Sequence, residues 1–276
     1  MGDMHRVAVL GYPIEHSLSP IVHNAGYAAL GLKNWHYDRY ECTAEQLPGL
    51  VHSLSDSYQG FSVTMPAKFA ALSFANTVSN RAQEIGSANT LVATENLGWY
   101  ADNTDCEGII GSLEQLGITR FSPGDRAVVI GGGGTARPTL WALAQLGIND
   151  VAVINRSDKT AELLPLVERS ATKFNMHSYD EDLGKICSGS SVIISTVPSA
   201  VVARYAPQIV HAPLIDVIYD PAPTPLQELA YERAIPAVGG HVMLAYQAYS
   251  QFELFTGQQA PREVMFQALE QALGLR

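Results

Sequence analysis

The stretch AVVIGGGGTARPTLWALAQLG, residues 127–147, has the pattern of a strand, a glycine turn and a helix. Residues 127–130 form a short apolar run with β-branched side chains, which is typical of a strand buried in a parallel sheet. Gly131, Gly133 and Ala136 fit G-x-G-x-x-A, where small residues permit a tight bend, close approach of a pyrophosphate and close helix packing. The pattern predicts a dinucleotide-binding turn, with a flexible glycine-rich loop as the alternative.

The segment that follows favours the dinucleotide reading. VAVI, residues 151–154, reads as the next strand and completes a β-α-β unit. An NAD-binding chain usually carries an acid at the end of this strand, but here Asn155, Arg156 and Ser157 follow it, with Lys159 close by. A guanidinium group suits a 2′-phosphate, so NADP is the predicted cofactor. The alternative is that Arg156 is a solvated surface arginine.

Length and charge narrow the class of protein. The 276 residues suffice for two domains or one large one. Seventeen basic and 27 acidic residues give a net charge of −10, which argues against nonspecific binding to nucleic acid or to an anionic membrane. No apolar run approaches membrane-spanning length, and no long apolar segment follows the first residues, so the cytoplasm is the expected location.

The residue types that bind metals are not grouped. The three cysteines lie far apart without a C-x-x-C spacing, which fits buried thiols in a reducing compartment. His16 and His23 lack a third ligand, so no metal site is expected.

Strand and helix patterns alternate along most of the chain. In the first part, strands are expected at residues 6–10, 35–42 and 60–64, and a hairpin is expected from strands at 88–92 and 98–102 around ENLG. Residues 127–238 repeat a strand-helix rhythm, which predicts a doubly wound parallel sheet. Helices over about 241–256 and 262–273 are expected to pack back on the first part. The predicted fold class is α/β.

Four polar clusters stand at expected strand ends or helix starts: HSLSP at 16–20, SVTMPAK at 62–68, SANT at 87–90 and ADNTD at 101–105. Paired serines beside free helical N–H groups suit a small carboxylate or phosphate, although simple capping by Ser19 is the alternative. Lys68 is one of only five lysines and has apolar neighbours, which suits a functional amine, although a surface lysine is commoner.

Together these clusters resemble the shikimate dehydrogenase family nearly from end to end. The stretches that carry the resemblance are GYPIEHSLSPIVHN, SVTMPAK, GSANT, ADNTD, IGGGGTA, NRS, DVIYDPAPTPL, GGHVMLAYQA and FELFTG. Several spaced motifs in the same order are far more specific than any one of them.

The resemblance implies a substrate-binding domain over residues 1–105, completed by residues 240–276, and a Rossmann-type NADP-binding domain over 106–239. It implies reversible, NADPH-dependent reduction of 3-dehydroshikimate to shikimate, a step in chorismate and aromatic amino-acid biosynthesis. Lys68 and Asp105 would lie at the reacting hydroxyl. The implied substrate-binding residues are Ser17 and Ser19 for the carboxylate and Thr64, Asn89, Tyr219 and Gln247 for the hydroxyls or ring. The implied cofactor-binding residues are Gly131, Gly132, Gly133, Gly134, Thr135, Asn155, Arg156, Ser157, Lys159, Thr196, Val217 and Gly240.

The chemistry of the implied reaction suits the lysine and the acid. Hydride transfer to a ketone leaves a developing alkoxide, which needs a proton donor within hydrogen-bonding distance. Lys68 can be that donor and Asp105 can anchor it; whether the lysine is the acid/base or an orienting charge stays open. The alternatives are an NAD-using quinate/shikimate dehydrogenase and a catalytically silent NADP-binding sensor. The oligomeric state is also open, a homodimer included.

Overall fold

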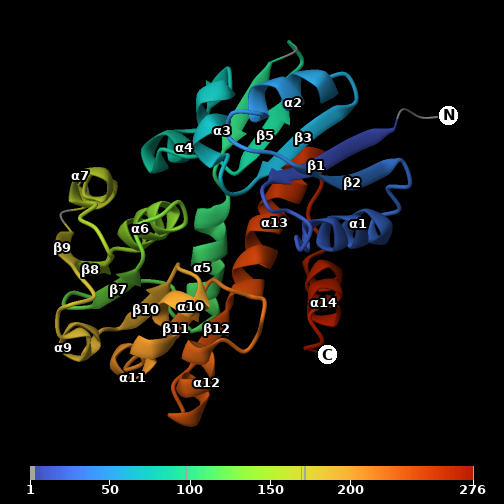
Figure 1. Cartoon of the computed structure of the whole chain (residues 1–276). Coiled ribbons are helices and arrows are strands. Elements are labelled where there is room, and N and C mark those ends of the chain that lie inside the picture. The colour runs from blue at the N-terminus through green and yellow to red at the C-terminus, as the bar shows by residue number, and fades with distance from the viewer. Residues whose placement is uncertain (1–3, 97, 169, 171, 276) are drawn as a thin grey trace. The chain divides into compact units, whose positions relative to one another are not determined.

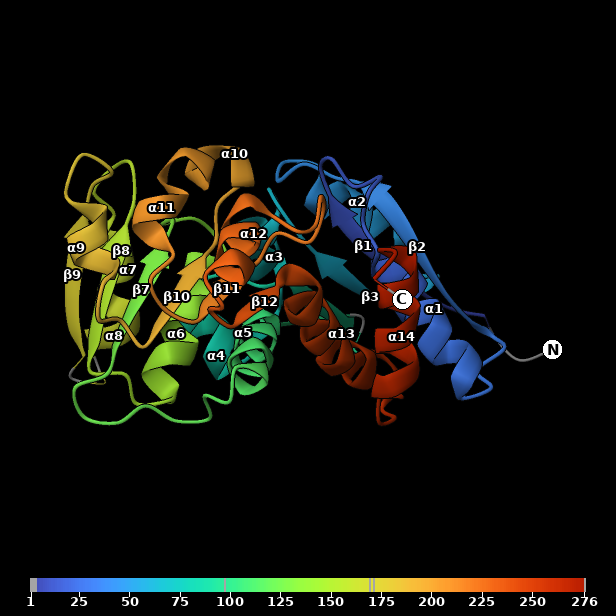
Figure 2. The ribbon, with the colours of Figure 1, turned by 90° about the horizontal axis from the view of Figure 1, so that it is seen from below.

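The computed structural model describes residues 4–96, 98–168, 170 and 172–275. The chain divides into two compact units, one of Met1–Asp105 with Leu244–Arg276 and one of Cys106–Met243. Each unit is built around one six-stranded sheet, and the predicted α/β class is confirmed (Figures 1 and 2).

The sheet of the first unit has the strand order β2-β1-β3-β5-β6-β4. Its strands are β1 (His5–Gly11), β2 (Trp35–Glu41), β3 (Tyr58–Val63), β4 (Thr77–Val78), β5 (Thr90–Ala93) and β6 (Trp99–Asp102). Strands β2, β1 and β3 are parallel, whereas β5 pairs antiparallel with both β3 and β6. The predicted hairpin is therefore confirmed as β5-β6; Leu97 of its ENLG turn lies outside the described residues.

Helices cover both faces of this sheet: α1 (Ser19–Ala29), α2 (Leu47–Leu54), α3 (Lys68–Phe74), α4 (Asn80–Ile85), most of α13 (Gly240–Thr256) and α14 (Arg262–Ala272). Successive residues of β1 point to opposite faces, so Val7 and Val9 join one core and Ala8 and Leu10 join the other. The first core contains α1, α13 and α14 side chains, and Figures 1 and 2 show these helices side by side. The C-terminal helices thus return to the N-terminal sheet.

The second unit contains a wholly parallel sheet of order β12-β11-β10-β7-β8-β9. Its strands are β7 (Arg126–Ile130), β8 (Asp150–Ile154), β9 (Lys173–His177), β10 (Val192–Ser195), β11 (Leu214–Asp216) and β12 (Ala237–Gly239). The strand order reverses between β7 and β10, which is the switch point of a doubly wound sheet. The glycine turn directly follows β7, so it lies where such sheets bind dinucleotides.

α5 (Asp105–Gln115) precedes β7, and further helices connect the strands of this sheet. They are α6 (Ala136–Gln145), α7 (Thr160–Leu163), α8 (Pro165–Glu168), α9 (Leu183–Cys187), α10 (Ser199–Val202), η1 (Ala203–Tyr205), α11 (Ala206–Ile209) and α12 (Pro225–Glu232). The edge strands β9 and β12 were not among the expected strands. β9 (KFNMH) alternates polar and apolar residues over only five positions and is only partly buried, and β12 has three residues, so both strand signals are too short to stand out.

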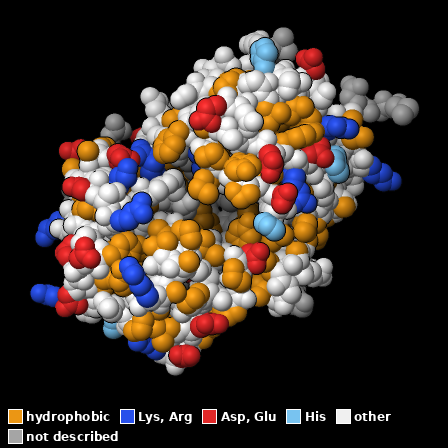
Figure 3. Space-filling view, viewed as in Figure 1, with side chains coloured by type: hydrophobic (Ala, Val, Ile, Leu, Met, Phe, Trp, Pro, Cys, Tyr) orange, Lys and Arg blue, Asp and Glu red, His pale blue; other side chains and the backbone are white. Residues whose placement is uncertain are grey.

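The surface carries charges of both signs. On the face drawn in Figure 3, acidic and basic side chains are interspersed among apolar and other side chains. Among the described residues, no helix has the length and apolar character that a membrane span requires.

Candidate active site and cofactor site

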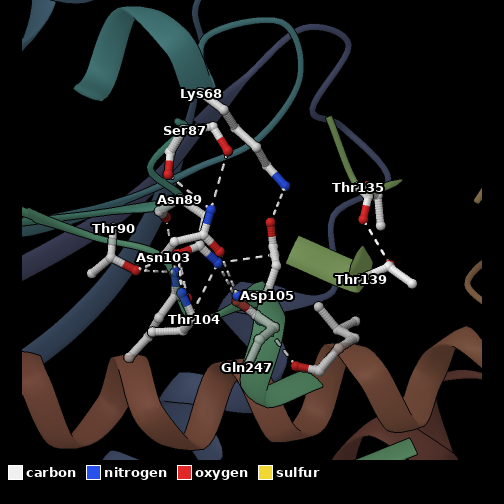
Figure 4. Close-up of polar contacts among 12 residues, drawn as sticks. Lys68, Ser87, Asn89, Thr90, Asn103, Thr104, Asp105, Thr135, Thr139 and Gln247 are labelled. Carbon is white, nitrogen blue, oxygen red and sulfur yellow. Dashed lines mark hydrogen bonds and ion pairs between the residues drawn. The ribbon is translucent and has the colours of Figure 1, made fainter. Parts of the chain in front are cut away.

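Lys68 and Asp105 form a partly buried ion pair in the first unit. Lys68 begins α3 just after the end of β3, and Asp105 begins α5 just after the end of β6. Lys68 Nζ lies 2.6 Å from Asp105 Oδ2, and the two side chains are 14% and 7% exposed. Figure 4 shows the side chains pointing toward each other. The ammonium thus lies at a fixed position beside a carboxylate, in surroundings that strengthen electrostatic interactions.

Asn89 connects this pair to the rest of the unit. Its Nδ2 donates to Asp105 Oδ1 at 3.0 Å and to Thr104 Oγ1 at 2.9 Å, and lies 3.4 Å from Gln247 Oε1. Its Oδ1 accepts from the Thr104 N–H at 2.8 Å and from Thr90 Oγ1 at 2.8 Å. These bonds use both the amino group and the oxygen of the amide, so Asn89 holds Asp105 in position. The 3.4 Å contact to Gln247 is the longest, and therefore the one that another hydrogen-bond partner replaces most easily.

Ser17 and Thr64 lie in the loops after β1 and β3, and Ser19 is the first residue of α1. These strands are neighbours in the sheet, and the Thr64 N–H donates to the Leu10 carbonyl at 2.8 Å. A Cβ on Gly11 would lie 2.3 Å from Thr64 Cγ2, so only glycine leaves room for Thr64 here. Ser17 Oγ accepts from the Ser19 N–H at 3.4 Å. The N-cap residue of α1 is Leu18, which offers no side-chain cap, and Ser19 is the first helical residue. The alternative reading of Ser19 as a simple N-cap is therefore wrong.

Two glutamines of α13 face the same polar cluster. Gln247, already predicted, is 8% exposed, and its Nε2 donates to the Leu244 carbonyl at 2.9 Å. Gln251 was not predicted, although it lies one helical turn further on. It is 1% exposed and its Nε2 donates to the Asn89 carbonyl and to Thr90 Oγ1, both at 2.9 Å. A second polar residue four positions after Gln247 is the signal that could have identified it.

A further buried chain of hydroxyls reaches Gln251. Ser62 Oγ donates to Gln251 Oε1 at 2.7 Å, and Tyr37 Oη donates to Ser62 Oγ at 2.5 Å. His23 stacks on Tyr37 with ring centroids 4.3 Å apart, and burial lowers the pKa of His23 to about 3. His23 is therefore a neutral core residue. Among the described residues there is no group of three His, Cys, Asp or Glu side chains that could hold a metal, and the three cysteines are free and buried.

The glycine turn of the second unit combines a glycine with positive φ and open space in front of a helix. Gly131 has φ +107°, and a Cβ on it would lie 2.5 Å from Thr196 Oγ1. By contrast, a Cβ on Gly133 or Gly134 would meet nothing within 4 Å, so both face open space before α6 begins. Thr135 follows them, and its carbonyl accepts from Thr139 Oγ1 at 2.8 Å. Open backbone before a helix N-terminus fits a pyrophosphate.

The end of β8 carries the residues predicted for a 2′-phosphate. Asn155 Nδ2 donates to the Ser157 carbonyl at 2.8 Å, which closes the turn around the exposed Arg156. A Cβ on Gly132 would lie 3.1 Å from Asn155 Cγ and 3.2 Å from Lys159 Cγ, so these residues adjoin the glycine turn. Lys159 Nζ, however, is paired with Glu162 Oε1 at 2.6 Å.

The remaining predicted residues follow β10, β11 and β12. Thr196 Oγ1 donates to the Ile130 carbonyl at 2.8 Å, which ties the end of β10 to β7. A Cβ on Gly240 would lie 2.0 Å from the Val217 carbonyl oxygen, so the backbones of these two residues touch. Tyr219 is half-buried in the loop after β11, and burial raises the pKa of its hydroxyl, which is therefore a neutral donor. Tyr219 belongs to the second unit, unlike the other predicted substrate residues.

Comparisons with known proteins identify the family of the chain. Residues 9–91 match the family model of the shikimate dehydrogenase substrate binding domain, and residues 240–270 match that of the shikimate 5′-dehydrogenase C-terminal domain. The chain is 33% identical to "Shikimate dehydrogenase (NADP(+))" of Microcystis aeruginosa, over 97% of both chains. It is similar to the crystal structure of Mycobacterium tuberculosis shikimate dehydrogenase, with 43% identity, a TM-score of 0.89, and coverage of 97% of this chain and 99% of that one.

A longer protein also matches. The chain is 32% identical to the pentafunctional AROM polypeptide of Saccharomyces cerevisiae over 95% of its own length, but it spans only 17% of the length of that polypeptide. The resemblance seen in the sequence motifs is confirmed by these matches. The chain belongs to the shikimate dehydrogenase family.

Proposed function

We propose that the protein is an NADP-dependent oxidoreductase that reversibly reduces 3-dehydroshikimate to shikimate, the first unit binding the substrate and the second binding NADP. The observation that carries the proposal is the partly buried pair of Lys68 and Asp105, 2.6 Å apart, in a chain of this family. The relative from Microcystis aeruginosa bears the name of an NADP(+)-dependent shikimate dehydrogenase, which supports the same cofactor here.

Lys68 and Asp105 transfer and orient the proton of the reaction. Bound NADPH supplies the hydride that the carbonyl carbon of the substrate receives. The carbonyl oxygen then gains negative charge, and Lys68 as an ammonium stabilises it and gives it a proton. Asp105 accepts hydrogen bonds from Lys68 and from the new hydroxyl, so both partners of the proton transfer stay aligned. In the reverse direction neutral Lys68 takes the proton back.

Other residues of the first unit bind and orient the substrate. Ser17 and Ser19, beside the start of α1, donate to the carboxylate. Thr64, Gln247 and Asn89 contact the hydroxyls or ring of the substrate. Asn89 Nδ2 gives up its 3.4 Å contact with Gln247 Oε1 and donates to the substrate instead. Tyr219 of the second unit contributes its neutral hydroxyl.

The second unit binds the cofactor through backbone and charge. The backbone of residues 131–135 binds the pyrophosphate. The 2′-phosphate is bound by Asn155, Arg156, Ser157 and Lys159. Thr196, Val217 and Gly240 lie along the adenosine or nicotinamide. Arg156 carries the choice of NADP over NAD, because its guanidinium can pair with the phosphate in two parallel hydrogen bonds.

The test is oxidation of NADPH by the purified chain, followed by the absorbance of the reduced nicotinamide, with 3-dehydroshikimate as substrate. We expect turnover with NADPH, a much lower kcat/KM with NADH, and shikimate turned over far better than quinate in the reverse direction. Equal rates with quinate, or a preference for NADH, would identify a quinate/shikimate dehydrogenase instead. Cofactor binding without turnover of either substrate would identify a silent sensor.

Glu162 is expected to weaken the binding of NADPH, because its carboxylate pairs with Lys159 at 2.6 Å and repels a 2′-phosphate. Glu162→Gln should therefore lower KM for NADPH by roughly threefold, within the range of about 0.2–1 kcal/mol that exposed ion pairs contribute. KM for NADH should not change, and the gain should shrink at high salt. Glu168→Gln, at an exposed acid of α8, is the matched control; an equal gain there would show a general charge effect instead.

A further inference from the structure

Arg81 and Asp102 form another ion pair of the first unit, and the reaction proposed above does not use it. Arg81 Nε donates to Asp102 Oδ1 and Arg81 Nη2 donates to Asp102 Oδ2, each at 2.7 Å, so the pair is bidentate. Ser79 Oγ donates to the same Oδ1 at 2.6 Å. The Asp102 side chain is 5% exposed and that of Arg81 is 24% exposed. Two parallel bonds fix the carboxylate in both position and orientation.

Asp102 is ionised in this setting. Burial by itself raises the pKa of Asp102, but the hydrogen bonds from Arg81 and Ser79 outweigh it and leave the pKa of this carboxyl below its ordinary value. A buried ion pair is weak evidence for stability, because desolvation offsets much of its Coulombic energy. The pair does, however, fix the position and orientation of the Asp102 carboxylate.

The fixed carboxylate lies three residues before Asp105, and hydrogen bonds connect the two. Asp102 Oδ1 accepts from the Asn103 N–H at 2.8 Å, and Asn103 Oδ1 accepts from the Asp105 N–H at 3.1 Å. Asn103 Nδ2 also donates to the Ser87 carbonyl at 2.9 Å. Arg81 is thus joined to the start of α5, where the Asp105 side chain leaves the backbone.

The same carboxylate-bearing residue holds Asn89, which is the other contact of Asp105. The Asn89 N–H donates to the Asp102 carbonyl at 3.1 Å, and the Ala88 N–H donates to the Lys68 carbonyl at 3.0 Å. Segments 87–89 and 102–105 and the first residue of α3 therefore form one hydrogen-bonded assembly. Figure 4 shows part of it, with Lys68, Ser87, Asn89, Asn103 and Asp105 labelled. Arg81 anchors this assembly to α4.

We propose that Arg81 is a positioning residue: by clamping Asp102 it holds segment 102–105 in place and so keeps Asp105 against Lys68. The consequence for catalysis rests on the function proposed above, whereas the effect on Lys68 and Asp105 themselves does not. A lysine at position 81 keeps the charge but loses the planar fork, so Arg81→Lys isolates the geometry of the clamp.

The first measurement is steady-state kinetics of Arg81→Lys. We expect kcat to fall on the order of tenfold with KM for shikimate changed by less than about twofold, because a misplacement of about 1 Å can cost about 10²-fold in rate. Arg126→Lys is the matched control: Arg126 lies 3.7 Å from Asp150 at the start of β7, and its kcat should stay unchanged. Ser79→Ala, which removes one donor to Asp102, should give a smaller decrease in kcat.

The second measurement does not depend on activity. Lys68 is acetylated with acetic anhydride, and its extent of modification is compared by mass spectrometry with that of the exposed Lys33 in the same molecule. We expect Lys68 to react several-fold faster relative to Lys33 in Arg81→Lys than in the wild type, and equally fast in Arg126→Lys. If the wild type reduces no 3-dehydroshikimate, the proposed function fails, but this ratio still decides whether Arg81 positions the pair.

Two outcomes would overturn the proposal. An unchanged ratio together with an unchanged kcat in Arg81→Lys would show that the clamp does not reach the pair. A structural role only would be shown by a lower melting temperature and an unchanged Lys68/Lys33 labelling ratio in Arg81→Lys, with kcat and the amount of substrate that the variant binds reduced by the same factor. Should Arg81→Lys fail to fold, the labelling ratio of Ser79→Ala decides in the same way.

Discussion

Lys68→Met is expected to lower kcat by about 10³-fold, within the range of about 10²–10⁴ that a positioned acid or base contributes. Methionine has a similar length to lysine but cannot stabilise the alkoxide or give it a proton. The Kd for shikimate, measured by calorimetry, should change by less than about threefold, because a group that acts in the transition state contributes little to ground-state binding. Steady-state kinetics in both directions measure the effect.

The substitution also leaves Asp105 buried beside Asn89 without its ammonium partner. Breaking such a pair can cost about 3–5 kcal/mol, so urea unfolding must show that the variant is folded under assay conditions. Lys33→Met, which removes an exposed lysine of the same unit, is the control and should retain full activity. A Lys68→Met enzyme with a near-normal kcat would remove the lysine from the mechanism, both as an acid/base and as an orienting charge.

Arg156→Gln is expected to raise KM for NADPH on the order of 10- to 100-fold and to leave kcat/KM for NADH nearly unchanged. Hydrogen bonds to charged groups contribute about 1.5–3 kcal/mol, and about 1.4 kcal/mol corresponds to a factor of ten. Because NADH lacks the 2′-phosphate, it loses nothing when the guanidinium is removed. Parallel titrations of the two cofactors at fixed 3-dehydroshikimate measure the ratio.

The control for Arg156 is Arg120→Gln, at an exposed arginine that precedes β7 in the same unit. It removes the same net charge and should leave the ratio of NADPH to NADH efficiency as it is. If both variants changed that ratio equally, the preference would come from the overall charge of the unit. If neither did, the 2′-phosphate would be bound elsewhere and Arg156 would be a solvated surface residue.

Local patterns predicted the parts of this fold that depend on neighbouring residues. The strand, glycine turn and helix of residues 127–147 were predicted together, because tight turns and helix periodicity are set within a few positions of the chain. The edge strands β9 and β12 were missed. The sequence KFNMH of β9 alternates polar and apolar residues over only five positions, and β12 has only three residues, so pairing with a neighbouring strand defines both.

The candidate site divides in the same way. Lys68, Asn89 and Asp105 could each be selected from a strand end or helix start, but their mutual contacts could not, because 37 residues separate Lys68 from Asp105. Gln251 reaches Asn89 across 162 residues, and Arg81 reaches Asp102 across 21. Arg81 in particular gives no local signal, since an arginine on a short helix is ordinarily a solvated surface residue.

The sequence by itself determined the α/β class, the dinucleotide turn and its candidate phosphate-binding end, and the polar residues available for chemistry, because each depends on residue type and spacing within one segment. Only the tertiary structure decided that Lys68 and Asp105 form a 2.6 Å pair, that the amide of Asn89 is already occupied, and that Arg81 clamps the segment before Asp105. The physical reason is that hydrogen bonds and ion pairs act over about 3 Å in space. Which residues come that close is decided by how the strands pair and the helices pack.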